Sequence, residues 1–354
     1  MAREIETSQV TFHVPDIQAS WPWPRTLHPD WEEAWAASRG WFLSFNVFGA
    51  KERQVYEACH IGLLSGLTFA LADKEIVRSG CDLLSIFLIF DETTDHLDED
   101  GVRQFAKLYL SAMKHPEMPR PHGETIVGEI VRQFWQRART RANPRFQRRF
   151  INEFEAFTEA VAQQAGDRTN RHFRSIEDYF AVRRGDVGLK PTIVLLLFNL
   201  DIDLPDEVLD HPALAEMEMC CVDSIITAND ITSYNREQAR GDDTHNLVSI
   251  VMQERGLDLQ SALYWIRDYQ EHVTQNFIRL RDEVCARVRE DLPTIWNERI
   301  EAQLKGYMGG LACWVRGNDA WGWECERYFG KEGMEVKNGK HVVLMPRKQQ
   351  TSRL

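Results

Sequence analysis

An apolar run that ends in carboxylates is the feature that most constrains this chain. The run 83–90 holds a single polar residue, Ser85, and the acidic sequence Asp91-Glu92-Thr93-Thr94-Asp95 follows it directly. The run is too short to span a membrane, so it predicts a buried element that brings carboxylates to the mouth of an apolar region. In a helix, Asp91 and Asp95 would be four residues apart and would lie on one face.

Two like charges above an apolar wall are unfavourable unless a cation is present. Phe87 lies one turn before Asp91 on the same helix face. Carboxylate oxygens are the hard ligands that Mg²⁺ prefers, so the pattern indicates a magnesium site. A solvated helix end is the alternative, because Asp and Glu are common surface residues.

A second polar sequence, Asn229-Asp230-Ile231-Thr232-Ser233-Tyr234-Asn235-Arg236-Glu237, follows near the middle of the chain. Asn229, Ser233 and Glu237 are spaced by four, so they drift by only about 80° around a helix over about 12 Å of its axis. An amide oxygen, a hydroxyl and a carboxylate on one stripe would chelate a hard cation and leave positions for water or phosphate. Arg236 would supply positive charge to the same anion.

Four motifs in this order and spacing resemble the class I terpene synthases. The chain has DExxD after an apolar run, and NDxxSxxxE begins 138 positions later (229 − 91 = 138). Arg183 lies 46 positions before Asn229 (229 − 183 = 46), where that family keeps a diphosphate-sensing arginine. Arg184 follows it, so either arginine fits the sensor. Arg327-Tyr328 resembles the Arg-Tyr pair that grips diphosphate in the fungal members.

The resemblance spans most of the chain, with departures. The first motif has Glu92 where many relatives have Asp. The family's helix break after the sensor would fall at Asp186-Val187-Gly188. The resemblance therefore implies a closing step in which diphosphate contacts Arg183, Asp186 and Arg327.

The resemblance also implies a cofactor, a substrate class and a cavity. Three Mg²⁺ ions would be held by Asp91, which carries most of the coordination on its side, with Asp95 ranked second, and by Asn229, Ser233 and Glu237. The diphosphate of a linear isoprenoid would be bound by these ions and by Arg183, Arg184, Arg236, Arg327 and Tyr328. Phe87 and Trp314 would line an apolar cavity and stabilise carbocations through their ring faces.

Within that family, a chain of this size without an additional domain is similar to the fungal sesquiterpene cyclases, which use farnesyl diphosphate. The lead-in rich in Trp and Pro and the DExxD variant resemble members that make humulyl-derived skeletons such as protoilludene. Two alternatives remain. One is a prenyl chain-elongating transferase, which would carry a second DDxxD in place of 229–237. The other is a non-catalytic helical scaffold with solvated acidic patches.

Composition limits the other classes of function. The chain of 354 residues has 42 basic and 54 acidic residues, a net charge of −12, which argues against nucleic-acid binding. Its seven cysteines lie in apolar, helix-like runs without CxxC, which predicts buried, reduced thiols and a cytoplasmic location. The first residues lack the apolar core of a signal peptide, and no apolar run approaches the length of a membrane span. We therefore expect a soluble protein, whose oligomeric state, monomer or homodimer, the sequence leaves open.

The pattern after Asp30 is helical almost throughout, with no alternating run long enough for a sheet. We expect an all-α class I terpenoid synthase fold of about a dozen helices around an apolar cavity. The parts are an extended lead-in at 1–30, a cyclase domain at 31–330 and a basic tail at 331–354, in which Val342-Val343-Leu344 could form a short docked strand. The expected helices are 31–46, 52–72, 75–92, 101–114, 124–141, 144–166, 175–184, 188–200, 211–238, 245–255, 259–288 and 292–327.

Overall fold

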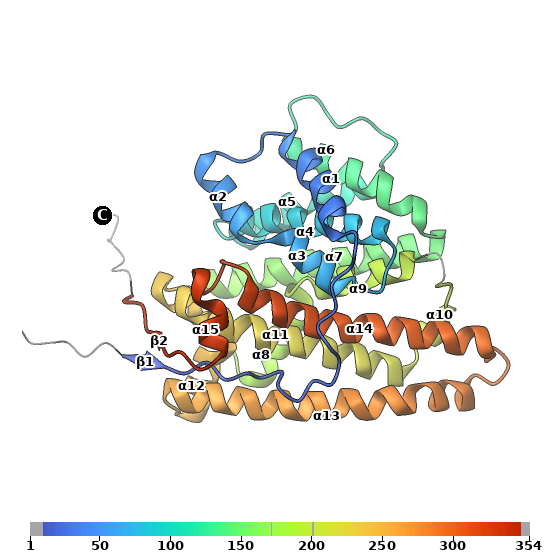
Figure 1. Cartoon of the computed structure of the whole chain (residues 1–354). Helices are drawn as coiled ribbons and strands as arrows, with labels where there is room; N and C mark the ends of the chain where they lie inside the picture. Colours follow the sequence, from blue (N-terminus) through green and yellow to red (C-terminus); the bar gives the residue numbers. More distant parts are fainter. Residues whose placement is uncertain (1–9, 171, 200–201, 348–354) are drawn as a thin grey trace, which may run out of the picture.

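The computed structural model describes residues 10–170, 172–199 and 202–347. Almost all regular structure in this part of the chain is helical, which confirms the predicted all-α class (Figure 1). The α-helices are α1 (Trp31–Leu43), α2 (Ala50–Ala58), α3 (Ile61–Thr68), α4 (Lys74–Thr94), α5 (Glu99–Lys114), α6 (Ile126–Ala138), α7 (Pro144–Asn170), α8 (Ile176–Asp186), α9 (Leu189–Val194), α10 (Asp206–Leu209), α11 (Pro212–Arg240), α12 (Leu247–Arg255), α13 (Leu259–Asp291), α14 (Glu298–Glu324) and α15 (Gly333–Lys337). Short 3₁₀ helices lie at Arg139–Arg141, Leu195–Phe198, Asp243–His245 and Gly330–Glu332. None of the described helices is both long and apolar enough to cross a membrane.

One small sheet joins the two ends of the described chain. Strands β1 (Thr11–Phe12) and β2 (Val342–Val343) are antiparallel, with Thr11 opposite Val343. The backbone N–H of Leu344 continues the pairing by donating to the carbonyl of Val10 at 2.8 Å. The short docked strand expected at 342–344 is therefore present, and its partner belongs to the lead-in.

The predicted helix 52–72 is wrong in one respect, because it is two helices. His60, between α2 and α3, has a φ of 48° in the left-handed region, which an α-helix cannot accommodate. No Gly or Pro marks this break in the sequence. The predicted helix 188–200 likewise ends early, since α9 gives way to the 3₁₀ helix Leu195–Phe198.

Other helix bounds differ at the ends. The helix expected from 292 starts at Glu298, where the side chain of Asn297 accepts the backbone N–H of Ile300 and caps the first turn. The short helices α10 and α15 were not predicted, because four or five residues carry too little periodicity to show in a sequence. All seven cysteines are free, and all but Cys285 are buried, as expected.

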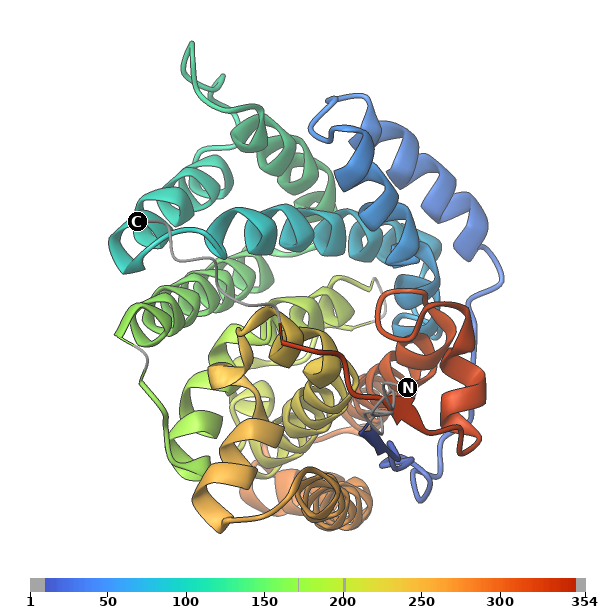
Figure 2. The same ribbon diagram turned by 90° about the vertical axis from the view of Figure 1, so that its left-hand side faces the viewer.

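The helices that position the site surround one apolar interior. Helix α11 packs against α13 and α14, while α7 contacts α8 and α9 (Figures 1 and 2). The break between α8 and α9 falls where the sequence predicted it. Gly188 has a φ of 72°, and a side chain there would meet Phe157 and Phe87, both at 3.4 Å. Glycine thus lets the chain turn close against the two phenylalanines.

Candidate active site

The first acidic motif lies at the carboxyl end of α4. Asp91 is in its last turn and Asp95 caps it, with the backbone N–H of Asp95 donating to the Asp91 carbonyl at 2.9 Å. Arg168 of α7 donates to the carbonyls of Thr94 and Leu97 at 3.0 and 2.8 Å. A cation at a helix carboxyl terminus is favourable, so Arg168 fixes the end of α4 that carries the motif. This role of Arg168 could not be predicted from the sequence, because Arg168 belongs to no spaced pattern.

Asp91 lacks a compensating partner. Its surface remains accessible to water, although many protein atoms surround its carboxylate, and the side chain accepts no hydrogen bond from the described residues. Burial among surrounding protein, followed by the charge of Asp95, raises the pKa of Asp91 to about 7, against the opposing charges of Arg327 and Arg183. These influences place the end of α4 within electrostatic reach of both arginines. Burial also raises the pKa of Asp95, and Arg168 opposes it.

The second motif lies on α11, and one amide side chain orders two of its three oxygens. Asn246, which caps α12, donates to Glu237 Oε2 at 2.9 Å and contacts Ser233 Oγ at 3.4 Å. Burial first, and then the charge of Asp230, raises the pKa of Glu237. Asn246 was missed in the sequence, where a single asparagine after a turn has no distinguishing pattern.

Arg183 connects the second motif to the helix break. Its guanidinium donates to Asp186 Oδ1 at 2.9 Å, to Asn229 Oδ1 at 2.8 Å and to Asp230 Oδ1 at 3.2 Å. Asp186 also contacts His245 Nε2 at 2.7 Å. Although burial works in the other direction, His245 and Arg183 keep the pKa of Asp186 below its usual value. Asp186 is therefore an ionised anchor that holds Arg183 beside the second motif.

Asp230, the second residue of NDxxSxxxE, does not join the stripe of its neighbours. Its carboxylate accepts hydrogen bonds from the Tyr179 hydroxyl and, at 2.8 Å, from the backbone N–H of Leu247. With Arg183 as a third donor, it is a buried support for that arginine. Tyr179 and His245, whose rings are in edge contact, were not singled out as site residues from the sequence.

The Arg-Tyr pair reaches the same place from the end of α14. Tyr328 Oη accepts a hydrogen bond from Asn229 Nδ2 at 3.1 Å, and burial raises its pKa to about 12, which keeps the hydroxyl protonated. Among the described residues, the side chain of Arg327 has one hydrogen-bond acceptor, the Cys59 thiol at 3.3 Å. A guanidinium has five N–H donors, so most of those of Arg327 are available to an anion. Arg236 donates to the backbone carbonyl of Arg327.

Arg184 is not brought to this group. Its guanidinium binds both oxygens of Asp223, at 2.7 and 2.8 Å, and lies 5.4 Å from the ring centroid of Phe180. Of the two arginines that the sequence left as candidates for the sensor, Arg183 contacts the second motif and Arg184 contacts Asp223. The inclusion of Arg184 among the diphosphate-binding residues has no support in its contacts.

The donors from α4 and α11 have the chemistry of a hard cation site. The side-chain donors expected from the two helices are all oxygens: Asp91, Asp95, Asn229, Ser233 and Glu237. Burial first, and a neighbouring carboxylate second, raise the pKa of both Asp91 and Glu237, and a bound cation would favour the ionised form of each acid. Within the described part of the chain, no three His, Cys, Asp or Glu side chains lie close enough to form a metal site by themselves. A hard cation bound by these oxygens would complete its coordination with water or a ligand.

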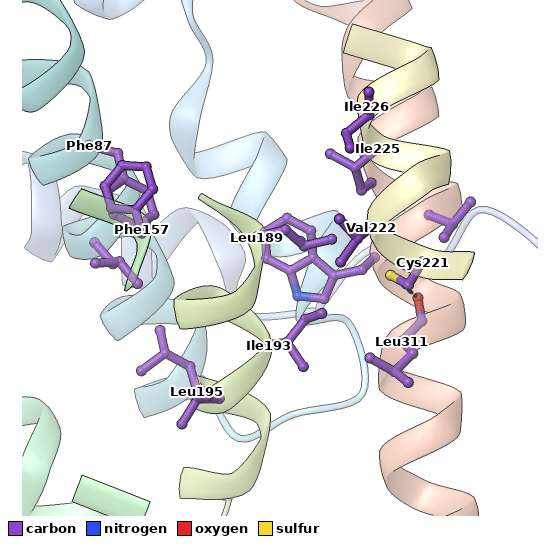
Figure 3. Packing of buried hydrophobic residues seen from close by; sticks show 14 of the residues in the cluster. Phe87, Phe157, Leu189, Ile193, Leu195, Cys221, Val222, Ile225, Ile226 and Leu311 are labelled. Carbon is purple, nitrogen blue, oxygen red and sulfur yellow. Dashed lines mark hydrogen bonds between the residues drawn. The ribbon is translucent and has the colours of Figure 1, made fainter. Parts of the chain in front are cut away.

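Apolar side chains lie beneath these polar groups. Figure 3 shows Phe87 and Phe157 on one side, Leu189 of α9 in the middle and Val222 of α11 on the other side. Phe87 is stacked on Phe154 at 5.9 Å between ring centroids.

Trp314, the second residue expected to line the cavity, is 3% exposed and meets Phe69 edge-on. Its indole N–H has no partner among the described residues. Phe87 and Trp314 therefore both lie in this apolar interior.

The chain matches known proteins over most of its length. The family described as terpene synthase family 2, C-terminal metal binding, matches residues 82–276. A delta(6)-protoilludene synthase of Armillaria gallica is 41% identical over 94% of both chains. One of Stereum hirsutum is 40% identical over 94% of this chain and 88% of its own.

Solved structures with the same fold are more distant in sequence. Germacradien-4-ol synthase from Streptomyces citricolor has a TM-score of 0.74 at 19% identity, over 85% of this chain and 96% of its own. Hedycaryol synthase in complex with nerolidol also has a TM-score of 0.74, at 20% identity, over 88% of this chain and all of its own. At such identities the likeness concerns the fold.

Proposed function

The chain belongs to the terpene synthase family and is a terpene cyclase, and from this premise we propose that it converts farnesyl diphosphate to a humulyl-derived sesquiterpene such as delta(6)-protoilludene. The curated relatives named delta(6)-protoilludene synthase support this product, since they are about 40% identical over nearly the whole chain. The main observation in support of the site is the position of Arg183. Its guanidinium donates to Asn229 of the second motif, and its charge lowers the pKa of Asp91 in the first motif.

We propose that the metal is Mg²⁺, because every donor is a hard oxygen, and that three ions bind, as the resemblance to the class I terpene synthases implies. Asp91 and Asp95 would hold it from α4, and Asn229, Ser233 and Glu237 from α11. When bound, Mg²⁺ supplies Lewis-acid stabilisation of the departing diphosphate.

The chain's own residues do the remaining work at the mouth of the site. Arg183 and Arg327 present N–H donors to the diphosphate oxygens, and charge-assisted contacts of this kind are the strong ones. The protonated Tyr328 hydroxyl adds a neutral donor beside Asn229. Arg236 adds positive charge next to Arg327. Asp186, the last residue of α8, holds Arg183 in place. A movement of Arg183 when diphosphate binds would therefore also move the α8–α9 break.

Below the mouth of the site, the apolar side chains exclude water and determine how the hydrocarbon part of the substrate folds. Exclusion matters because water would capture the allylic cation as an alcohol. The ring faces of Phe87 and Trp314 are placed to stabilise positive charge.

The cyclase domain would be 31–330, flanked by the lead-in 1–30 and the tail 331–354, of which 1–9 and 348–354 lie outside the described residues. Free, mostly buried cysteines fit the reducing cytoplasm. Size-exclusion chromatography with light scattering would decide between monomer and homodimer.

The test is gas chromatography–mass spectrometry of volatiles after incubation with farnesyl or geranyl diphosphate and Mg²⁺. A single dominant sesquiterpene from the farnesyl substrate, with release of diphosphate, is the expected result. Consumption of added isopentenyl diphosphate would instead indicate a chain-elongating transferase. Absence of diphosphate release from either substrate would overturn the proposal and leave a helical scaffold.

A further inference from the structure

A further acidic residue of α11, Glu218, lies far from the mouth of the site. Glu218 precedes Asn229 by eleven residues, which is three turns of helix and about 16 Å of axis on nearly the same face. Val222 and Ile225 lie between them and project towards Leu189 of α9 (Figure 3). Glu218 therefore lies on the same side of α11 as Asn229, beyond Val222 and Ile225, and its separation from Asn229 is comparable with an extended farnesyl chain.

Groups from several helices enclose Glu218. The Tyr307 hydroxyl of α14 donates to Glu218 Oε1 at 2.7 Å, and Tyr307 is 2% exposed. The charged and titratable groups that face Glu218 are Arg149 and Glu153 of α7, Lys190 of α9, Tyr307 of α14 and Cys221 of α11. Glu218 nevertheless keeps part of its surface accessible.

The protonation of Glu218 suits acid–base chemistry. Burial raises its pKa to about 7, against the hydrogen bond from Tyr307 and the charge of Arg149. A group that titrates near the working pH is the best placed to take up and return a proton. Arg149 in turn donates to Asp210 at 2.6 Å, whose side chain is 64% exposed, so the cluster extends to bulk water.

Resting on the proposed cyclase function, we propose that Glu218, oriented by Tyr307, is the general base that removes a proton from the final carbocation. The C–H bond next to the cationic carbon breaks, and its electron pair becomes the second bond of the new alkene. The proton forms an O–H bond on the Glu218 carboxylate and later returns to water. No further reactant is needed. The site acts when positive charge has migrated along the hydrocarbon away from the diphosphate.

The first test compares Glu218→Gln with Glu216→Gln. Gln keeps the shape and an acceptor for Tyr307 but cannot take the proton. Glu216, on the same helix as Glu218, is exposed and is paired with Arg279 of α13 at 3.0 Å. In Glu218→Gln we expect near-normal diphosphate release from farnesyl diphosphate. The share of the main hydrocarbon should fall by about tenfold or more in favour of isomeric alkenes and alcohols. An unchanged product pattern in Glu218→Gln, or the same change in Glu216→Gln, would overturn the proposal.

The second test is a pH profile of the products, which a merely structural role would not move. In the wild type, the share of the main hydrocarbon among the products should rise as the pH increases, with a midpoint near pH 7. Tyr307→Phe removes a hydrogen bond that favours the carboxylate, so the midpoint should move to higher pH. This variant decides the matter alone if Glu218→Gln does not fold, and an unmoved midpoint refutes the role. A wild type that releases no diphosphate would refute the cyclase function instead, so the two failures are distinguishable.

Discussion

At the scale of single residues, the Asp91 carboxyl lowers the stability of the folded chain by an amount that depends on pH. Its pKa is raised to about 7, through burial first and Asp95 second, from the ordinary 3.8 of an unfolded chain. Ionisation of Asp91 therefore lowers the free energy of unfolding as the pH rises from about 4 to about 7, and the loss is complete above that range. We predict that Asp91→Asn in EDTA melts close to the wild type at pH 4 and a few degrees above it at pH 8, as measured by circular dichroism.

Asp100→Asn is the matched control, because the Asp100 side chain is 94% exposed. All other acids are common to both proteins, so their contributions to the pH dependence cancel in the difference. A melting difference between Asp91→Asn and the wild type that is the same at pH 4 and pH 8 would contradict the electrostatic account of this site.

Adjacent arginines offer a second comparison at this scale. Arg183 has three acceptors around the second motif, whereas Arg184 is paired with Asp223. Lysine keeps the charge but cannot reproduce several directed N–H donors. We predict that Arg183→Lys lowers diphosphate release by ~10²-fold and that Arg184→Lys stays within several-fold of the wild type. Equal losses in stopped-assay kinetics, with intact helical circular dichroism, would remove Arg183 from its sensing role.

At the scale of elements, the segment 341–347 is held against α11 by hydrogen bonds from two side chains of that helix. Asn235 binds the carbonyl of Val343 and the N–H of Met345, both at 2.9 Å, and Gln238 binds the Met345 carbonyl at 2.8 Å. Arg347 pairs with Asp243 at 2.7 Å, in the turn that leads to Asn246. The segment thus ties down both the helix that carries Ser233 and Glu237 and the turn that orders them.

We predict that a chain ending at Lys340 needs several-fold more Mg²⁺ for half-maximal diphosphate release and melts a few degrees lower. A chain ending at Arg347 retains every contact just described and is the control. Mg²⁺ titrations of the two truncated proteins decide the matter. If both require the same concentration as the full chain, the segment has no influence on the ligands.

Particular elements show what the sequence could and could not predict. The stripe on α11 and the break at Gly188 were predictable because helical periodicity and glycine are local signals. The break at His60 was not, since its left-handed backbone depends on how α2 and α3 pack. The roles of Arg168 and Asn246 were also missed, because each is a single residue whose partners are brought near only by the fold.

At the scale of the whole molecule, the chain brings α4, α8, α11 and the end of α14 around one set of charges. Asp91 responds to Arg183 and Arg327, Asn229 binds both Arg183 and Tyr328, and Glu237 responds to Arg183. The spacing of motifs indicated the participants, but their convergence is a property of the tertiary structure. A ligand that binds across these elements should therefore stabilise the entire fold.

We predict that Mg²⁺ and diphosphate together raise the melting temperature, whereas either alone has little effect. Cations need the anion to complete their coordination between α4 and α11, and the anion needs the cations to offset the carboxylates. At a ligand concentration of about 100 times the dissociation constant, the gain is about 2.7 kcal/mol. Scanning fluorimetry with Mg²⁺, diphosphate, both, and both with EDTA measures it. Asp91→Ala should abolish the shift and Asp100→Asn should retain it, and a full shift with diphosphate alone would show that the arginines bind it without metal.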